Sequence, residues 1–179
     1  KIIKEIIKGV SVILEAERCT LFLADDANNC LWAIVNQVGE NIIIEIPNDR
    51  GIAGNVYKSG KLLNITDCYA DARFNHAVDR ESGFKTRTIL ASPVPDALTA
   101  KPMGVIQAIN RIGGHFTKSD EYRMHQLCSM VSRILSMSET LEDLTVSAEF
   151  QEKIFQKISL PVITLNATGH CTKVSADAA

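Results

Sequence analysis

The sequence contains none of the short patterns by which many enzymes and metal proteins are identified. It has no phosphate-binding P-loop, no glycine-rich dinucleotide fingerprint and no Gly-x-Ser-x-Gly nucleophile elbow. The histidines His76, His115, His125 and His170 are scattered, and no two have the His-x-x-x-His spacing of a zinc site. We therefore expect no catalytic residues and no bound metal in this chain.

Closely spaced cysteines are also missing. The chain has Cys19, Cys30, Cys68, Cys128 and Cys171, but no Cys-x-x-Cys pair and no zinc knuckle. Several of these cysteines sit among apolar neighbours. We expect them to be reduced and mostly buried thiols.

The chain lacks a strong charge of one sign and a long apolar run. Its 19 basic and 21 acidic residues are interspersed and give a net charge of −2, which argues against a basic face for nucleic acid. No apolar run approaches the roughly 18 residues of a membrane span, and the amino end is typical of an amphipathic helix rather than a signal peptide. We expect a cytoplasmic protein or a cytoplasmic fragment of one.

Apolar residues make up 46% of the chain, and their spacing predicts its elements. A helix is expected at residues 1–18, and a short one closed by Gly60 at residues 51–59. Strands are expected at residues 19–25, 30–37, 41–46, 62–67, 86–94 and 103–110. This order predicts an α+β fold with a mostly antiparallel sheet and helices gathered against it. The polar residues 68–85 are too numerous for a simple connection and are expected to be functional.

A long helix is expected from Asp120 to about Ile158, followed by strand, glycine turn and strand in residues 159–179. The apolar positions of the helix have a mixed three-four spacing and are Leu127, Val131, Ile134, Leu141, Leu144 and Phe150. Such a helix is either a coiled-coil linker or a docking helix. In a parallel dimer, all of these positions except 150 are expected to form the seam.

The stretch NRIGGHFTKSDE, residues 110–121, joins the last strand to this helix. Its two glycines allow the bend, and Ser119 or Asp120 is expected to cap the helix. An arginine at one end and an acidic pair at the other can close the loop as a clip.

These residues resemble the asparagine-lysine, phenylalanine, aspartate-glutamate signature of cyclic-nucleotide-binding GAF domains. Asn110, Phe116, Asp120 and Glu121 stand in its places, and Arg111 replaces the usual lysine. The resemblance covers residues 16–135 and includes RCTLFLAD, IPNDRGIAGNVYKSGKLLNITDCYADARFN and DRESGFKTRTILASPV. It is shared by the regulatory GAF domains of mammalian cyclic nucleotide phosphodiesterases and of cyanobacterial adenylate cyclases.

The resemblance implies a central antiparallel sheet of about six strands, with helices packed on one side and a long C-terminal linker helix. Residues 159–179 are similar to the start of a PAS domain, which favours the cyclases. The implied divisions are a connecting helix at 1–17, a GAF domain at 18–135, a linker helix at 136–158 and a truncated PAS domain at 159–179. The chain is then the second GAF domain of a tandem.

In this family the signature braces the pocket and does not bind the ligand. It implies an ion pair between Arg111 and Asp120, with Phe116 as an apolar anchor. The alternative is an exposed pair, worth only about 0–1 kcal/mol, in which Asp120 merely caps the helix.

The resemblance places the cyclic phosphate at Ile52 and Ala53, where backbone N–H groups at a helix start suit an anion. The alternative is that this segment is only a tight turn. Arg18 and Thr20 hold base-contact positions. Asn36 stands where phosphodiesterases have a stacking aromatic residue, and Gln37 where a guanine-reading carboxylate can occur. Because neither is acidic, adenine is the expected base.

Residues 68–85 resemble the lid that covers the ligand in this family. Ligand-facing positions in and beside the lid are held by Phe74, Asn75, Asp79, Ser82 and Thr86. Asp79 is otherwise a plain helix-start acid. Gln107 in the last strand is expected to contact ligand, although an exposed face of an alternating strand would also explain it.

We expect a regulatory domain that binds cyclic AMP and signals through a dimeric helix to PAS and adenylate cyclase domains. Its expected partners are a second copy and the adjacent GAF and PAS domains. The alternatives are a cyclic GMP-binding phosphodiesterase-type GAF domain, a GAF sensor for another small ligand such as a bilin or haem, a GAF-fold methionine sulfoxide reductase and a purely structural dimer module.

Overall fold

The computed structural model describes residues 2–37, 40–96, 99, 101–157, 163–165 and 171–174. It divides into two compact units, residues 1–134 and 135–179, and each is described by itself. The elements are, in chain order, α1 (Ile2–Ile13), β1 (Ala16–Asp25), β2 (Cys30–Gln37), β3 (Glu40–Pro47), α2 (Gly51–Ser59), β4 (Leu63–Ile65), the 3-10 turn η1 (Cys68–Ala70), α3 (His76–Ser82), β5 (Ile89–Val94), β6 (Gly104–Arg111), α4 (Lys118–Lys157), β7 (Ile163–Leu165) and β8 (Cys171–Val174).

The first unit is built on a six-stranded antiparallel sheet with the order β3-β2-β1-β6-β5-β4. The centre of the sheet is the pair β1–β6, in which Thr20 lies opposite Gln107 and Phe22 opposite Val105. Strands distant in the sequence therefore become neighbours. The predicted α+β class with about six antiparallel strands is confirmed.

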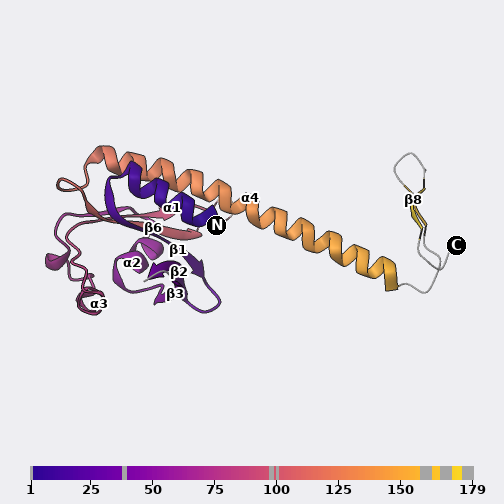
Figure 1. Ribbon diagram of the computed structural model, residues 1–179, viewed down its shortest axis with the longest axis horizontal. Coiled ribbons are helices and arrows are strands. Elements are labelled where there is room, and N and C mark those ends of the chain that lie inside the picture. The colour runs from indigo at the N-terminus through magenta and orange to yellow at the C-terminus, as the bar shows by residue number, and fades with distance from the viewer. Residues whose placement is uncertain are drawn as a thin grey trace. The chain divides into compact units, whose positions relative to one another are not determined.

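Helices cover both faces of this sheet, so the expectation that they pack on one side is wrong for α2. Figure 1 shows α1 and the start of α4 on one face and α2 on the other. The reason lies in the central strands, where apolar residues point both ways: Val105 belongs to the core cluster under α2, and its neighbour Ile106 is fully buried on the other face. A strand that is apolar on both faces needs a covering layer on each.

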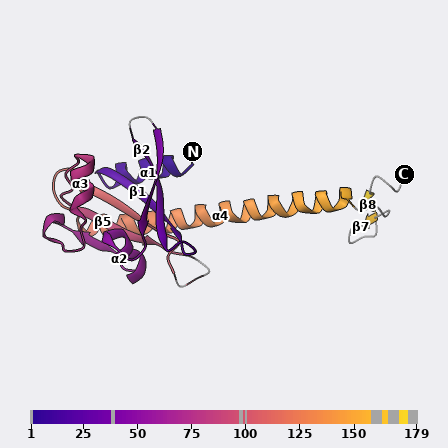
Figure 2. The same cartoon turned by 90° about the horizontal axis from the view of Figure 1, so that it is seen from below.

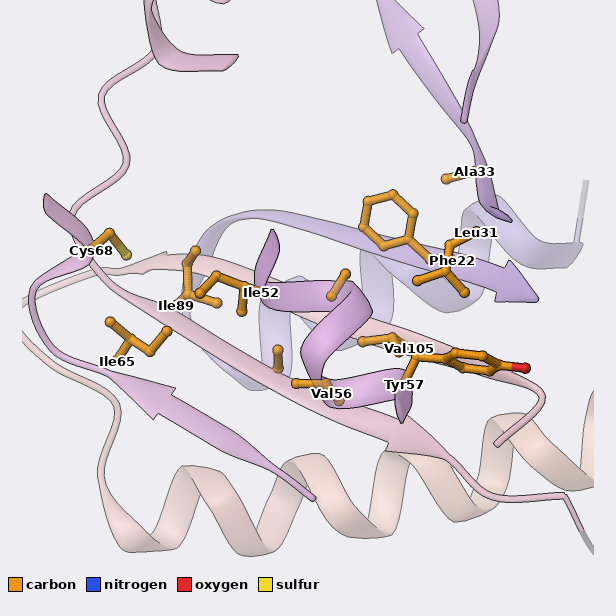
Figure 3. Close-up of a cluster of buried hydrophobic side chains, with 12 residues drawn as sticks. Phe22, Leu31, Ala33, Ile52, Val56, Tyr57, Ile65, Cys68, Ile89 and Val105 are labelled. Carbon is orange, nitrogen blue, oxygen red and sulfur yellow. The ribbon is translucent and has the colours of Figure 1, made fainter. Parts of the chain in front are cut away.

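The core on the α2 side is drawn in Figure 3. Side chains from α2 lie over those of the central strands and of the segment around η1. The cluster consists of Phe22, Leu31, Ala33, Ile52, Ala53, Val56, Tyr57, Ile65, Cys68, Ile89, Ala91 and Val105. The predicted closing residue of α2, Gly60, has φ 63° and donates its N–H to the carbonyl of Val56.

Helix α1 is shorter than the predicted helix of residues 1–18. It ends at Ile13, Glu15 has φ 50°, and Ala16 already pairs with Arg111 in the sheet. A left-handed residue cannot continue a right-handed helix. The segment after Leu14 therefore turns into β1.

Helix α4 uses part of its apolar surface to close its own domain. Met124, Cys128 and Val131 are buried against the sheet. Val131 is only 2% exposed, so its expected place in a dimer seam is wrong. Met130 and Met137 are exposed instead, at 59% and 67%.

The second unit contains the antiparallel pair β7–β8, with Ile163 opposite Val174. The predicted strands of residues 159–179 include this pair, and the glycine turn between them lies outside the described residues. In the described part of the chain, no helix is both long and apolar enough to cross a membrane.

Candidate functional site

Three predicted ligand residues lie on the face of the sheet that α2 covers. Arg18 lies opposite Ile109, and Thr20 opposite Gln107. Ile109 packs against the core cluster on this side, and residues two apart on a strand share a face. The side chains of Arg18, Thr20 and Gln107 therefore share this face, which we call the pocket face. Arg18 is exposed and the other two are half-buried.

The start of α2 faces the same side. Its preceding residue, Arg50, makes no side-chain cap, so the first N–H groups of the helix have no side-chain acceptor. The side chains of Ile52 and Ala53 are 5% and 2% exposed and point into the core, as Figure 3 shows for Ile52. Only their backbone groups are free to meet an anion. Gly54 has no room for a side chain, because a Cβ would lie 3.1 Å from the backbone of Asn48.

The remaining predicted base contacts, Asn36 and Gln37, lie at the end of β2, opposite Asn41 and Glu40 of β3. The pairing of β1 with β2 spans Leu23–Asp25 and Cys30–Trp32, so both residues fall beyond it. Their side chains lie outside what the structure describes.

In the lid, residues 68–85, Asp79 is bound by the segment that follows it. Its Oδ2 accepts from the Thr86 N–H at 2.6 Å and from the Tyr69 hydroxyl at 3.0 Å, and its Oδ1 accepts from the Thr86 hydroxyl at 2.7 Å. Burial alone would raise the pKa of Asp79, but these hydrogen bonds outweigh it and lower the pKa. The carboxylate is ionised and joins Tyr69, near the start of the lid, to Thr86 just after its end. The role of Tyr69 was not predicted, because no pattern in the sequence indicates it.

The other lid residues also have partners within the lid. The Asn75 side chain caps α3 by accepting from the Ala77 N–H at 3.1 Å, and Ser82 Oγ accepts from the Phe84 N–H at 3.3 Å. Phe74 packs against the core cluster, and its ring lies 5.6 Å from that of Tyr69. Asn75 and Ser82 thus shape the lid, and Phe74 attaches it to the core. In Figure 2, α3 lies above and α2 below the part of the sheet that is labelled β5.

One aromatic side chain joins the lid to the pocket face. Phe84, just after α3, places its ring centroid 3.7 Å from the guanidinium carbon of Arg18. No pattern in the sequence predicts the contact between these two residues.

One cavity in the described part of the chain has a volume of about 1000 Å³. It lies beside the lid and is lined by Thr66, Asp67, Tyr69, Asp79, Arg80, Gly83, Phe84, Lys85, Thr86, Arg87 and His115. Of the predicted ligand residues, only Asp79 and Thr86 line it. Arg18, Thr20 and Gln107 do not line this cavity, but Phe84, which does, contacts Arg18.

The signature loop forms the expected clip. Arg111 Nε donates to Asp120 Oδ2 at 2.9 Å, with Asp120 only 1% exposed. Asp120 also accepts from the Thr117 N–H at 2.8 Å, and the Asp120 N–H donates to Thr117 Oγ1 at 3.3 Å. Thr117, not Ser119 or Asp120, is thus the N-cap of α4. The Thr-x-x-Asp spacing of a capping box was the signal that could have identified it.

Asn110 ties the end of β6 to the end of the lid. Its Oδ1 accepts from the Arg87 N–H at 2.6 Å, and its Nδ2 donates to the Lys85 carbonyl at 2.9 Å and to Glu17 Oε2 at 2.8 Å. Glu17 also pairs with Arg87. Asn110 is 1% exposed and has φ 56°, a left-handed conformation that asparagine tolerates.

Phe116 and Glu121, the two remaining signature residues, hold the edge strand β4. The Asn64 amide of β4 donates to the Phe116 carbonyl and to Glu121 Oε1, both at 2.9 Å. Phe116 is 4% exposed, which makes it the predicted apolar anchor. The signature therefore connects β4, β6 and α4 around one end of the sheet.

The four cysteines whose side chains the structure describes are free thiols, and the expected burial holds for two of them, while Cys19 and Cys30 are half-buried. Cys68 and Cys128 are fully buried, and burial raises the pKa of Cys68 to about 12 and that of Cys128 to about 11. Such thiols are poor nucleophiles at neutral pH. Within the described residues, no group of three or more His, Cys, Asp or Glu side chains could hold a metal ion.

Comparison with known proteins gives relatives that are named as phosphodiesterases. A Caenorhabditis elegans protein named probable 3′,5′-cyclic phosphodiesterase is 35% identical over 132 residues, which are 67% of this chain and 18% of that protein. A dual 3′,5′-cyclic-AMP and -GMP phosphodiesterase of Drosophila melanogaster is 31% identical over 134 residues, which are 65% of this chain and 9% of that protein. The chain thus spans less than a fifth of the length of either relative.

Solved structures share the fold at low identity. The GAF domain of an Acinetobacter phosphoenolpyruvate-protein phosphotransferase has a TM-score of 0.63 and 18% identity, covering 76% of this chain and 81% of that one. The free methionine-R-sulfoxide reductase of Neisseria meningitidis also has a TM-score of 0.63, with 17% identity and coverage of 79% and 81%. The family model described as GAF domain matches residues 1–135. This chain therefore belongs to the GAF domain family.

Proposed function

We propose that this chain is a regulatory GAF domain that binds cyclic AMP. The observation that carries the proposal is the convergence of Arg18, Thr20 and Gln107 on the pocket face with the uncapped start of α2. Polar side chains on the sheet suit a base and a ribose, and free N–H groups at a helix start suit a cyclic phosphate. Relatives named for cyclic AMP and cyclic GMP hydrolysis support a cyclic nucleotide as the ligand.

Two features support adenine as the base. Gln107 can accept a hydrogen bond from the adenine amino group and donate one to a ring nitrogen, whereas guanine needs an acceptor for two neighbouring donors. The carboxylate of Asp79 could supply such an acceptor, but it already accepts hydrogen bonds from Thr86 and Tyr69. A domain of this kind binds and does not catalyse, so we propose no enzymatic reaction for these residues.

The proposed output is a PAS domain followed by an adenylate cyclase, reached through α4. The support is the similarity of residues 159–179 to a PAS start, and the proposal includes a preceding GAF domain. A homodimer would join copies along Leu127, Met130, Ile134 and Met137, whose spacing of three and four continues to positions 141 and 144. This line replaces the seam that included Val131.

The alternative is a cyclic GMP-binding domain of the phosphodiesterase type, since the curated relatives are named as phosphodiesterases and one is named for both cyclic AMP and cyclic GMP. Competition calorimetry distinguishes the two. We expect cyclic AMP to bind at least about tenfold more tightly than cyclic GMP, a difference of about 1.4 kcal/mol. Equal affinities or a cyclic GMP preference would overturn the adenine assignment, and binding of neither would overturn the proposed function.

A matched pair of variants sharpens this experiment. Gln107→Glu supplies a carboxylate on the pocket face and should shift the preference toward cyclic GMP. Gln126→Glu makes the same change on an exposed part of α4 and should have no effect. Mass spectrometry of ligand released from protein purified without added nucleotide gives an independent identification.

A further inference from the structure

We propose that Phe84 is a positioning residue for base recognition, because it holds the Arg18 guanidinium on the pocket face so that the base stacks on the free side of Arg18. This inference rests on the proposed function and concerns a residue that the sequence did not single out. We call the pair of side chains the Arg18–Phe84 stack.

The first support is the contact itself. The Arg18 guanidinium carbon lies 3.7 Å from the centroid of the Phe84 ring, well within the range of a cation–π interaction. A planar guanidinium covered on one side by a ring still offers its other side. Arginine commonly stacks on aromatic surfaces, and nucleic-acid bases present such a surface to it.

The second support is that no carboxylate or carbonyl of the described residues binds the Arg18 side chain directly. Among the residues that the structure describes, its side chain makes no ion pair and no hydrogen bond. The nearby Glu17 is engaged by Asn110 and Arg87. An exposed cation that is held by a ring rather than by a carboxylate keeps its donors and its free face for a ligand.

The third support is the position of the stack. Arg18 shares the pocket face with Thr20 and Gln107, while Phe84 belongs to the lid, whose exit is fixed by Asp79 and Thr86. Asn36 supplies no aromatic ring for the base. The Arg18–Phe84 stack provides a surface of that kind from a different part of the chain. It also makes base binding depend on a docked lid.

The test compares cyclic AMP with ribose 3′,5′-cyclic phosphate, which has no base. Phe84→Leu keeps the apolar volume and removes the π surface, and Phe84→Tyr keeps both. We expect Phe84→Leu to weaken cyclic AMP binding about tenfold while leaving the baseless ligand unchanged, and Phe84→Tyr to restore the wild-type affinity. Tyr122→Leu, an exposed aromatic residue of α4, is the control and should bind as wild type.

A second arm tests whether the effect passes through Arg18. In an Arg18→Ala background, Phe84→Leu should cause no further loss of cyclic AMP affinity. The ring-current shift of the Arg18 Nε–H proton in the free protein should disappear in Phe84→Leu, which checks the contact without any ligand. Wild-type affinity in Phe84→Leu, or an equal loss for both ligands, overturns the inference alone. Failure of the wild-type protein to bind cyclic AMP overturns the proposed function and this inference with it.

Discussion

Arg111 and Asp120 form an ion pair of 2.9 Å in which the carboxylate is 1% exposed and the guanidinium side chain 19%. Because of this burial the pair differs from an ordinary surface ion pair: removing one partner leaves the charge of the other without a counter-charge. The pair lies where the last strand of the sheet passes into α4. It therefore joins the pocket side of the domain to its exit helix.

A double-mutant cycle with Arg111→Ala and Asp120→Ala should show coupling above about 0.5 kcal/mol in the free energy of unfolding. Arg123 offers the matched comparison, because it reaches the same carboxylate at 3.2 Å but is 48% exposed. Its coupling to Asp120 should be smaller. Urea denaturation measures the free energy of unfolding of the variants at Arg111, Asp120 and Arg123. Strict additivity for Arg111 and Asp120 would show that their ion pair contributes no coupling energy.

The clip should also make stability depend on acid. Burial alone would raise the pKa of Asp120, but the hydrogen bonds from Thr117 and Arg111 outweigh it and lower the pKa below its ordinary value. A carboxyl with a lowered pKa stabilises the fold above its unfolded pKa and loses that contribution as pH falls through the folded value. Urea melts between about pH 5 and pH 2 should show a shallower decline for Asp120→Asn than for wild type.

The control for this titration is Asp49→Asn, which removes an exposed carboxylate that lies 3.8 Å from Arg50. It should follow the wild-type curve. If Asp120→Asn declines as steeply as the wild type, other carboxyls are responsible for the acid sensitivity.

Asn110 should be among the most sensitive positions of the domain. Asn110→Ala removes four side-chain hydrogen bonds and places alanine at φ 56°, so we expect a loss of at least about 2 kcal/mol in unfolding free energy. Asn110→Gly loses the same bonds without the backbone strain and should be less harmful. Equal losses would mean that the left-handed backbone contributes nothing.

Binding should be transmitted from the lid to α4. Hydrogen exchange on a dimeric protein, with and without cyclic AMP, should show increased protection in residues 68–85 and altered protection in residues 120–144. The route runs from Gln107 along β6 to Asn110 and the clip. A lid that responds while the helix does not would leave nucleotide binding intact and contradict the route.

The exposed apolar line of α4 should control self-association. Met137→Glu places a charge on this line and should shift the protein toward monomer in sedimentation velocity. His125→Glu lies on an exposed part of α4 at a position that faces away from the line, and it should keep the oligomeric state of wild type. A dimer unaffected by Met137→Glu would mean that copies associate through another surface.

Much of the fold followed from local patterns in the sequence. An apolar run predicted β2, the glycine at position 60 predicted the end of α2, and the long three-four spacing predicted α4. Helix α1 was predicted too long because a single residue, Glu15, adopts a left-handed conformation that its side chain does not announce. The clip was also predictable, since its residues lie within one short loop.

The sequence by itself determined the family, the order of the strands along the chain and the ion pair of the signature loop, because each depends on residues close together in the chain or on a linear pattern. Only the tertiary structure decided which helices cover which face, that Val131 belongs to the core rather than to a seam, and that Asp79 binds Thr86 and Tyr69. It alone brought Phe84 onto Arg18. The contact of Phe84 with Arg18 and the burial of Val131 join segments far apart in the sequence, and packing of the whole sheet selects them. The contacts of Asp79 lie within the lid, whose irregular backbone follows no periodic pattern.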